Sequence, residues 1–592
     1  MATDSELLHR DLEAPVASTA AEATASSSTR ESPLILGVLG HSELDVQRMP
    51  RLRDALTAFL SEIEHHLPDT ELRVIVGVTG GGDLLFVRGA LERGLQVEMV
   101  LPEALDAFTA GLDAEGRATL HGLLEHANVR CSQLSSPPVS GGRAGSTEPG
   151  GALYTALTET LVRRSSILLT PWDGNAPGRT GIPDAALRHV GIRADDQASE
   201  VSLVMLGLAD DVDATDSVVS WTPAGREEMG SAAAARATPR MPAQLVRQLI
   251  DLNTYNRDFR RLRAQRPTPP VGSLLTHVAS DMALEERQGL AAVDAEYGKA
   301  DALALHYQSR ADRLFTLFVA MAFTMGLAYL VYDKLTHRSA LLISYLVVLI
   351  CSLSLYYALR GQRWYAKHLT YRALAETLRV TFYLRLAGID QRLDAARVLA
   401  LSGINRFRGF SLITHVLAAV AVPGTQAGER RAPDPERTRC IELEWIEGQY
   451  RYFTAKVAQL KRKGRRVKIL KNALFTIIVI GIVAMILSQG LMEGYTVVTG
   501  VSLQNGVTFV EGVLALLLGA WQLHDTNKAT RELLLQYRNQ GTHFARARQQ
   551  LSALTDLAGR DDILLELGRD SLMESYMWTI HRYHREHEPG RH

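Results

Sequence analysis

The chain has 592 residues, enough for about four domains of 150 residues each. Apolar residues make up 46% of the chain and charged residues 22%, so it is neither disordered throughout nor uniformly buried in a membrane. The formal net charge of −1 argues against a general nucleic-acid-binding protein, which normally has a basic surplus. The three cysteines lie far apart in the sequence, which excludes a small disulfide-stabilised secreted protein.

Residues 1–31 are rich in Ala, Ser, Thr and acidic side chains, and they predict a disordered leader. Over residues 32–225, apolar strand-like runs alternate with amphipathic helical runs. This alternation predicts βαβ units with a mostly parallel sheet covered on both faces, that is, a Rossmann-like α/β domain that binds a ligand. Charged helical segments over residues 226–310 predict a helical connector.

Four apolar stretches have the length of about 20 residues that a bilayer-spanning helix needs. They are residues 314–332, 339–359, 472–492 and 503–523. We therefore expect an all-α membrane region with four transmembrane helices and cytoplasmic helical extensions. The expected order is a first hairpin with its following helix (311–400), a helical layer (401–460), a second hairpin (461–524) and a helical tail (525–592).

Basic residues beside the spans predict their orientation. Arg360, Arg363, Lys367, Arg372 and Arg379 follow the second span; Lys461, Arg462, Lys463, Arg465, Arg466, Lys468 and Lys471 precede the third. Residues 472–527 contain neither Lys nor Arg. This pattern predicts a multi-pass protein of the cell (inner) membrane with both termini in the cytoplasm. The first hairpin loop departs from the rule, because Lys334 and Arg338 outnumber Asp333.

One further stretch competes as a membrane span. Residues 409–428 contain no Asp, Glu, Lys or Arg, but they include His415 and Pro423. A fifth span would place the basic flank of one hairpin outside the cell. We therefore interpret this stretch as a buried cytoplasmic helix.

Glycines follow three predicted strands of the α/β domain. Parallel sheets bind ligands at the carboxyl ends of their strands, where glycine lets a phosphate approach backbone N–H groups. Trp172 could stack on a base, Asp173 could accept from a ribose hydroxyl, and Arg179 could pair with a phosphate. The alternative is that these glycines only serve tight turns. The candidate ligand-binding residues are Gly37, Gly40, His41, Ser42, Gly80, Gly81, Gly82, Asp83, Trp172, Asp173, Gly174, Gly178, Arg179 and Thr180.

Two common nucleotide-binding motifs do not fit these loops. Asp83 stands where a P-loop has its lysine, and the first turn lacks the G-x-G-x-x-G dinucleotide motif. ATPase and ordinary dehydrogenase activity are therefore not expected. We predict a nucleotide or nucleotide-derived ligand and no required cofactor or metal.

The α/β domain resembles the SLOG superfamily. The similarity lies in the run from Gly37 to His41, the Gly82–Asp83 turn, Leu101–Pro102, and the run from Ser166 to Gly174. The most similar branch is the one related to the cytoplasmic ligand-binding region of TRPM channels. This resemblance implies a Rossmann-like fold that binds, or in some members cleaves, nucleotides and related ligands.

The chain departs from this superfamily at two points. Ser42 follows Gly-His where members often have Arg. The branch that removes ribose phosphate has a GGxGT run followed by a catalytic Glu, whereas this chain continues from Gly178 to Asp184 without a Glu in reach. We therefore expect binding rather than hydrolysis, and no catalytic residue is assigned.

The membrane region resembles the SLATT family, whose two-helix effector modules accompany SLOG domains in prokaryotic conflict systems. The residues behind this similarity are Tyr371, Arg372, Glu376, Arg379, Trp445, Gln449, Tyr450, Gln536 and Tyr537. The resemblance implies a pore-forming membrane effector in antiviral defence, switched by a nucleotide signal. The expected partners are the ligand, the lipid bilayer and further copies of this chain, without direct contact to nucleic acid.

Polar residues inside the fourth span form one helical face. At about 100° per residue, Gln504, Thr508, Glu511 and Gln522 fall within about 60° of one another. A carboxylate in the hydrocarbon is costly, so this face is our candidate pore lining. The alternatives are a hydrogen-bonded seam between helices or a shallow position for Glu511. A membrane-tethered enzyme for a nucleotide or phosphoribosyl compound and a membrane-anchored scaffold are the competing functions.

Overall fold

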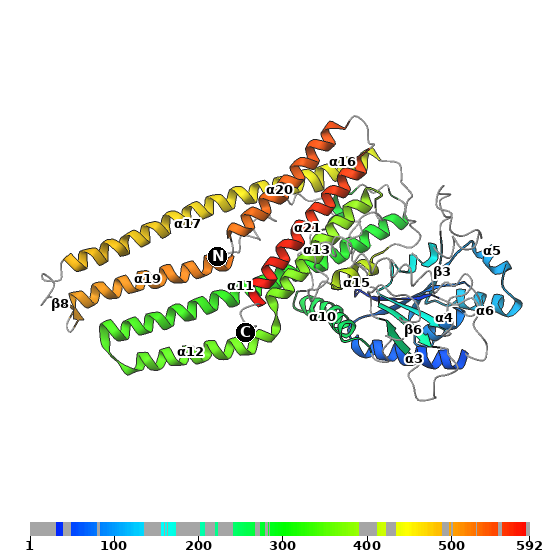
Figure 1. The fold of residues 1–592 in the computed structure, drawn as a ribbon, viewed down its shortest axis with the longest axis horizontal. Helices are drawn as coiled ribbons and strands as arrows, with labels where there is room; N and C mark the ends of the chain where they lie inside the picture. Colours follow the sequence, from blue (N-terminus) through cyan, green and yellow to red (C-terminus); the bar gives the residue numbers. More distant parts are fainter. Residues whose placement is uncertain are drawn as a thin grey trace. The chain divides into compact units, whose positions relative to one another are not determined.

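The full-length chain is described by a computed structural model (Figure 1). The structure describes residues 31–39, 49–79, 83–134, 156–158, 160–162, 164–172, 202–207, 219–222, 241–266, 273–278, 282, 284–389, 411–421, 434–487, 496–498, 501–528, 530–554 and 559–587. The chain divides into two compact units, and each is made of two stretches of sequence. One unit comprises residues 1–300 and 374–432, and the other comprises residues 301–373 and 433–592.

The first unit contains a seven-stranded sheet with the order β4-β3-β2-β1-β5-β6-β7. The pairs β4–β3, β3–β2, β2–β1, β1–β5 and β5–β6 are parallel. The last pair, β6–β7, is antiparallel. This arrangement confirms the predicted α/β character with a largely parallel sheet. The strands are β1 (Leu34–Leu39), β2 (Leu72–Gly77), β3 (Gln96–Leu101), β4 (Val129–Gln133), β5 (Ile167–Trp172), β6 (Ser202–Gly207) and β7 (Val219–Thr222).

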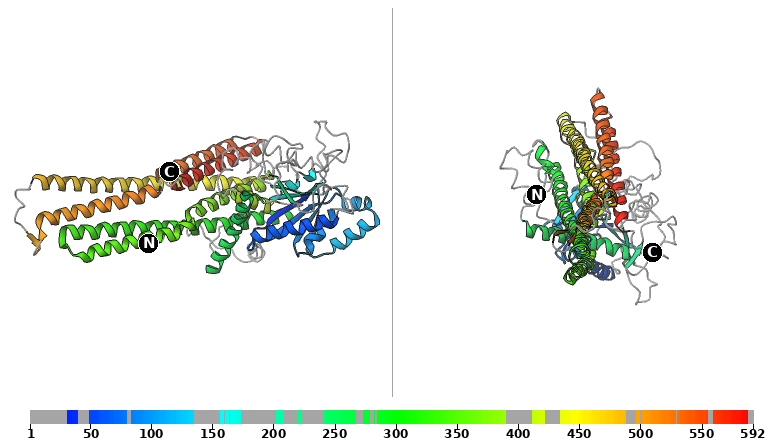
Figure 2. Two further views of the ribbon diagram at one scale, coloured as in Figure 1. Left: turned by 60° about the horizontal axis from the view of Figure 1, so that its bottom comes forward. Right: turned by 90° about the vertical axis from the view of Figure 1, so that its left-hand side faces the viewer.

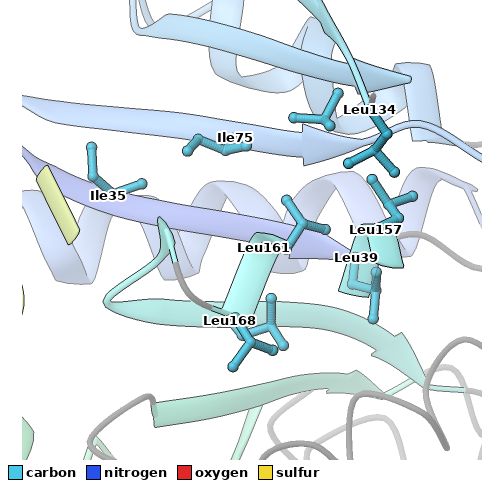
Figure 3. Packing of buried hydrophobic residues seen from close by; sticks show 9 residues of the cluster. Ile35, Leu39, Ile75, Leu134, Leu157, Leu161 and Leu168 are labelled. Atoms are coloured by element: carbon cyan, nitrogen blue, oxygen red, sulfur yellow. The ribbon is translucent and has the colours of Figure 1, made fainter. Parts of the chain in front are cut away.

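The sheet is covered on both sides at its central strand. All six residues of β1 are buried, and successive residues of a strand point to opposite faces. On one face, Ile35 and Leu39 pack with Leu157 and Leu161 (Figure 3). The helices of this region are α3 (Met49–His66), α4 (Leu84–Leu91), α5 (Leu105–Ala110) and α6 (Ala114–Leu124). Because neither face of β1 is in contact with water, its sequence LILGVL is apolar throughout instead of alternating with polar residues.

Two helices from distant parts of the sequence complete this unit. Helix α10 (Ala243–Gln265) contacts α3, and helix α15 (Ser411–Ala419) contacts both β1 and α10. His415 of α15 is buried, and burial lowers its pKa to about 4, so the side chain is neutral at pH 7. This packing agrees with the interpretation of residues 409–428 as a buried helix. The part of the stretch that the structure describes is a nine-residue helix against the sheet.

Four helices are long and apolar enough to cross a membrane, which confirms that part of the prediction. No residue of their most apolar windows is buried inside the protein, so these side chains need an apolar environment outside it. α11 lies beside α12, and α17 beside α19, as two antiparallel pairs (Figure 2). The helices are α11 (Leu284–Val331), α12 (Ser339–Leu359), α17 (Gly448–Leu487) and α19 (Leu503–Lys528).

Shorter helices continue or flank the four apolar ones. α11 ends in a π-helical turn at Tyr332–Thr336, and the π-helical segment Ile441–Glu447 leads into α17. After α12, Arg363 adopts a left-handed conformation with φ of 48°, so α13 begins as a separate helix instead of continuing the span. The remaining helices are α13 (Trp364–Leu386), α16 (Pro435–Cys440), α20 (Thr530–Ala553) and α21 (Arg560–His587).

Helix α19 contacts both α11 and α17 through glycines. A Cβ on Gly326 of α11 would lie 2.6 Å from the Leu516 side chain, and one on Gly512 of α19 would lie 2.8 Å from the Leu330 side chain. On the α17 side, the Glu511 carboxylate occupies the space over Gly481. Small residues allow helix backbones to approach closely in a membrane, which explains why glycines stand at these positions.

Candidate functional site

The three glycine-marked strand ends lie side by side at one edge of the sheet. β1 is paired with β2 on one side and with β5 on the other, and all three run parallel. Their carboxyl ends are Leu39, Gly77 and Trp172. The loops predicted to bind the ligand therefore leave from adjacent strands. Most of the predicted ligand-binding residues lie outside the described ranges, namely Gly40, His41, Ser42, Gly80, Gly81, Gly82, Asp173, Gly174, Gly178, Arg179 and Thr180.

Two glycines of the predicted loops have packing roles. Gly37 lies within β1, and a Cβ on it would come within 2.7 Å of Ser165. Gly77 ends β2, and a Cβ there would come within 2.6 Å of the Leu161 side chain. Both contacts are to residues just before β5, so close approach of that segment to the sheet requires glycine. For Gly37 the structure thus provides the alternative explanation, in which glycine serves packing.

Asp83 organises its own turn. Its carboxylate is fully buried, and its Oδ2 accepts from the backbone N–H of Thr79 at 2.6 Å and from the Thr79 hydroxyl at 2.7 Å. These bonds join Thr79, after β2, to Asp83 at the start of α4. Because the side chain is turned inward, Asp83 is better suited to shaping this loop than to contacting a ligand directly.

The polar face of α19 is directed towards α17. Thr508 contacts the Met485 sulfur at 3.5 Å and donates to the Gln504 carbonyl at 2.8 Å. Gln522 accepts from Lys471, which also pairs with Asp525 at 2.9 Å. These contacts correspond to the interhelical-seam alternative. Gln504 and Gln522 remain exposed, so α17 covers only part of this face.

Glu511 lies near the middle of this seam. Its Oε1 atom is shielded from solvent, and within the described part of the chain it has no hydrogen-bond partner. Residues 472–527 contain neither Lys nor Arg. An intramembrane carboxyl of this kind marks a candidate functional residue.

A buried polar cluster at the opposite end of β1 was not predicted from the sequence. Ser32, just before β1, donates through its hydroxyl to Glu296 at 2.6 Å, and Lys299 donates to the other Glu296 oxygen at 2.6 Å. Asn256 of α10 accepts from the Ser32 N–H at 3.1 Å and donates to the Ser32 carbonyl at 2.9 Å. We call Ser32, Asn256, Glu296 and Lys299 the polar joint.

The polar joint is held almost entirely out of water. All four of its residues are at most 7% exposed. Burial and the neighbouring Glu296 raise the pKa of the Tyr255 hydroxyl well above its usual range. In a low-dielectric interior, a fully bonded ionic cluster fixes one geometry, because each unmatched partner would be costly. In the sequence, Glu296 and Lys299 look like an ordinary surface pair, and nothing identifies a partner 264 residues away.

Arg372 and Arg379, two of the residues behind the expected similarity, hold helices together. Arg372 of α13 pairs with Asp301 of α11 at 3.1 Å. Arg379 pairs with Glu376 at 2.9 Å and donates to the Tyr297 hydroxyl at 2.8 Å. These contacts give the motif a structural basis in joining α13 to α11.

A matching set of contacts joins the helices around α17. Trp445 is 1% exposed and packs edge-on against Phe544, with ring centroids 6.2 Å apart. Arg548 lies over the Tyr450 ring at 4.5 Å, and Tyr537 packs on Phe453. Aromatic and cation–π contacts therefore connect α17 with α20.

Comparison of the chain with known protein families, with curated proteins and with solved structures found no match. The site is therefore interpreted from its own residues and geometry.

Proposed function

We propose that this chain is a ligand-responsive effector of the inner membrane, with both termini in the cytoplasm. A Rossmann-like domain binds a nucleotide or nucleotide-derived ligand, and the four spans of several copies form a pore that the ligand opens. The resemblance to SLOG and SLATT proteins supports this assignment and a place in bacterial defence signalling. The proposal contains no catalytic step.

The strand order supports the ligand site. The order changes direction between β1 and β5, because β2, β3 and β4 lie on one side of β1 and β5 to β7 lie on the other. In parallel sheets, ligand-binding crevices lie outside the carboxyl ends of the strands at such a switch point. The glycine-rich sequences that begin at Gly40 and Asp173 follow these two strands.

The continuity of α11 is the observation that carries the proposal. This single helix of 48 residues contains Glu296 and Lys299 of the polar joint and also the first apolar span. A displacement of β1 would act on Ser32 and Asn256, and through Glu296 on α11. A ligand shifts such an equilibrium only by its differential affinity for the two states, about 1.4 kcal/mol for each tenfold change.

A membrane-anchored protein without a pore is the second candidate. Thr508, Glu511 and Gln522 of the polar face of α19 contact α17, and this observation favours a purely structural seam. A membrane-tethered enzyme for a nucleotide or phosphoribosyl compound would be distinguished by product formation. The three functions therefore differ in two measurable quantities, ion flux and turnover.

The test uses the full-length chain in liposomes with a panel of ATP, NAD, ADP-ribose and cyclic nucleotides. Cation flux and product formation are recorded with each nucleotide, and binding is measured by calorimetry. We expect one nucleotide class to bind and to increase flux without being consumed. Binding without flux from inserted protein would favour the anchor, consumption would favour the enzyme, and no binding would refute the ligand site.

Glu296→Gln tests the coupling. Glutamine keeps one acceptor but loses the charge that pairs with Lys299, so we expect ligand affinity to persist while ligand-dependent flux falls. The matched control is Asp312→Asn, an exposed position on the same helix, which should change neither quantity.

Glu511→Gln should alter ion selectivity or conductance without changing nucleotide affinity.

A further inference from the structure

Helix α17 carries a dense group of basic side chains just before its apolar part. Six of the eight residues from 461 to 468 are basic, and all six are exposed. No Asp or Glu occurs in α17. We call Lys461, Arg462, Lys463, Arg465, Arg466 and Lys468 the basic belt.

The belt covers most of the circumference of the helix. At about 100° per residue, its six side chains occupy an arc of about 220°. The half-buried residues Leu460, Gly464, Val467 and Lys471 lie in the remaining arc, on the protein-facing side. An arc this wide exceeds what one partner helix can contact, whereas it suits a layer of many small anionic groups.

Three of the five basic residues in the other flank of the membrane region make contacts within the protein, whereas Arg360 and Arg363 are exposed. After α12, Arg372 pairs with Asp301, Arg379 pairs with Glu376, and Lys367 lies over the Tyr307 ring at 5.0 Å. By contrast, within the described residues Lys461, Arg462, Arg465, Arg466 and Lys468 make no ion pair. Orientation by positive charge requires only the charges, and it does not by itself explain why five basic side chains of one short segment stand without an acidic partner among the described residues.

The end of the belt nearest the span lies beside the headgroup layer. The span begins at Asn472, and at 1.5 Å per residue the belt lies about 6 to 17 Å before it. The polar headgroup layer extends about 5 to 8 Å beyond the hydrocarbon on each side. When the apolar part of α17 spans the bilayer, Lys468 lies within the headgroup layer. Arg465 and Arg466 lie about 1 to 3 Å beyond it, within reach of their long side chains.

We propose that the basic belt is a binding surface for anionic phospholipid headgroups of the leaflet at that end of α17. This inference rests on the membrane placement in the proposed function, but it is independent of the nucleotide site. Clustered Lys and Arg next to a span attract anionic lipids by about 1 kcal/mol per residue. Because α17 packs directly on α19, headgroup binding would hold the end of the second hairpin at a fixed depth.

The first experiment is native mass spectrometry of the detergent-solubilised full chain, titrated with phosphatidylglycerol or phosphatidylcholine. The variant Arg465→Gln/Arg466→Gln/Lys468→Gln should weaken retention of phosphatidylglycerol by about fivefold per charge, or about 100-fold in total. The matched control Arg261→Gln/Arg263→Gln/Arg266→Gln removes three exposed charges at the end of α10 and its C-cap and should leave retention unchanged. Phosphatidylcholine should bind weakly to all three proteins.

Three outcomes would overturn the proposal: equal losses in both triple variants, equal retention of the two lipids, or displacement of phosphatidylglycerol by inorganic phosphate at equal concentration. The last result would indicate a site for free phosphate. The charge-preserving variant Arg465→Lys/Arg466→Lys should keep the lipid preference, and its loss would contradict an electrostatic surface. Resistance of the chain to alkaline extraction from membranes tests membrane placement separately, so failure of the proposed function is distinguishable from failure of the lipid site.

Discussion

At the scale of single residues, the interior of the sheet unit contains an ion pair that makes the protein sensitive to acid. Arg164 binds both oxygens of Glu98 on β3, at 2.8 and 2.6 Å, and Ser132 donates to the same carboxylate. Burial alone would raise the pKa of Glu98, but the hydrogen bonds and charge of Arg164 lower it below its usual value of 4.5. The folded chain therefore binds a proton at Glu98 less readily than the unfolded chain does.

This pair predicts how stability changes with pH. Since the pKa of Glu98 is depressed by folding, its contribution is complete above pH of about 4.5 and is lost as the pH falls through the folded pKa. Glu98→Gln leaves Arg164 buried without its counter-charge, so it should lower the free energy of unfolding by about 3 kcal/mol near pH 7. The deficit should shrink in acid, as measured by hydrogen exchange of β3 in graded denaturant.

The control for this prediction is Glu92→Gln. Glu92 pairs with Arg53 at 2.8 Å, but the two side chains are 44% and 58% exposed. An exposed pair of this kind contributes less than about 1 kcal/mol. An equal loss of unfolding free energy in the two variants would contradict a stabilising role for the Glu98–Arg164 pair. A loss in Glu98→Gln that does not depend on pH would contradict it as well.

At the scale of elements, the contact between α11 and α19 depends on two glycines. Gly326→Val would drive a methyl group into Leu516, and Gly512→Val would do the same at Leu330. Overpacking of this kind lowers the free energy of unfolding by about 1–3 kcal/mol. The thermal midpoint of the detergent-solubilised protein should therefore fall for each variant.

Gly519→Val serves as the matched control, because nothing lies within 4 Å of a Cβ at that position. It introduces the same β-branched residue into the same helix, so it carries the same propensity cost without a clash. A midpoint for Gly519→Val as low as that for Gly512→Val would show that helix propensity, rather than the α11–α19 contact, causes the loss.

At the scale of the whole molecule, the order of spans along the chain decides which segments share a side of the membrane. Because α15 packs against β1, the stretch after it should not cross the bilayer. Reporters inserted after Gly428 and fused after His592 should therefore both be cytoplasmic, and one after Gly500 should be external. A reporter after Gly428 found on the external side would show that residues 409–428 span.

Much of this architecture was predictable from local patterns. Apolar runs of fixed length identify the four long helices, since a helix that is apolar on all sides must be surrounded by lipid or protein. The alternation of strand-like and helical runs identifies the parallel sheet by the same logic of burial. Glycines at Gly40, Gly80–Gly82 and Gly174 mark the strand ends, but the sequence does not distinguish a ligand-binding glycine from one required by packing, as Gly37 illustrates.

Only the tertiary structure decided which residues meet. The order of strands around β1, the contacts of the polar face of α19 with α17, and the bond of Glu296 to Ser32 all join residues far apart in the chain. Such contacts depend on how elements dock, and docking is set by the summed packing of many side chains. A local pattern therefore predicts that Glu296 lies on a charged helix, whereas only the folded chain buries it against Ser32 at the start of β1.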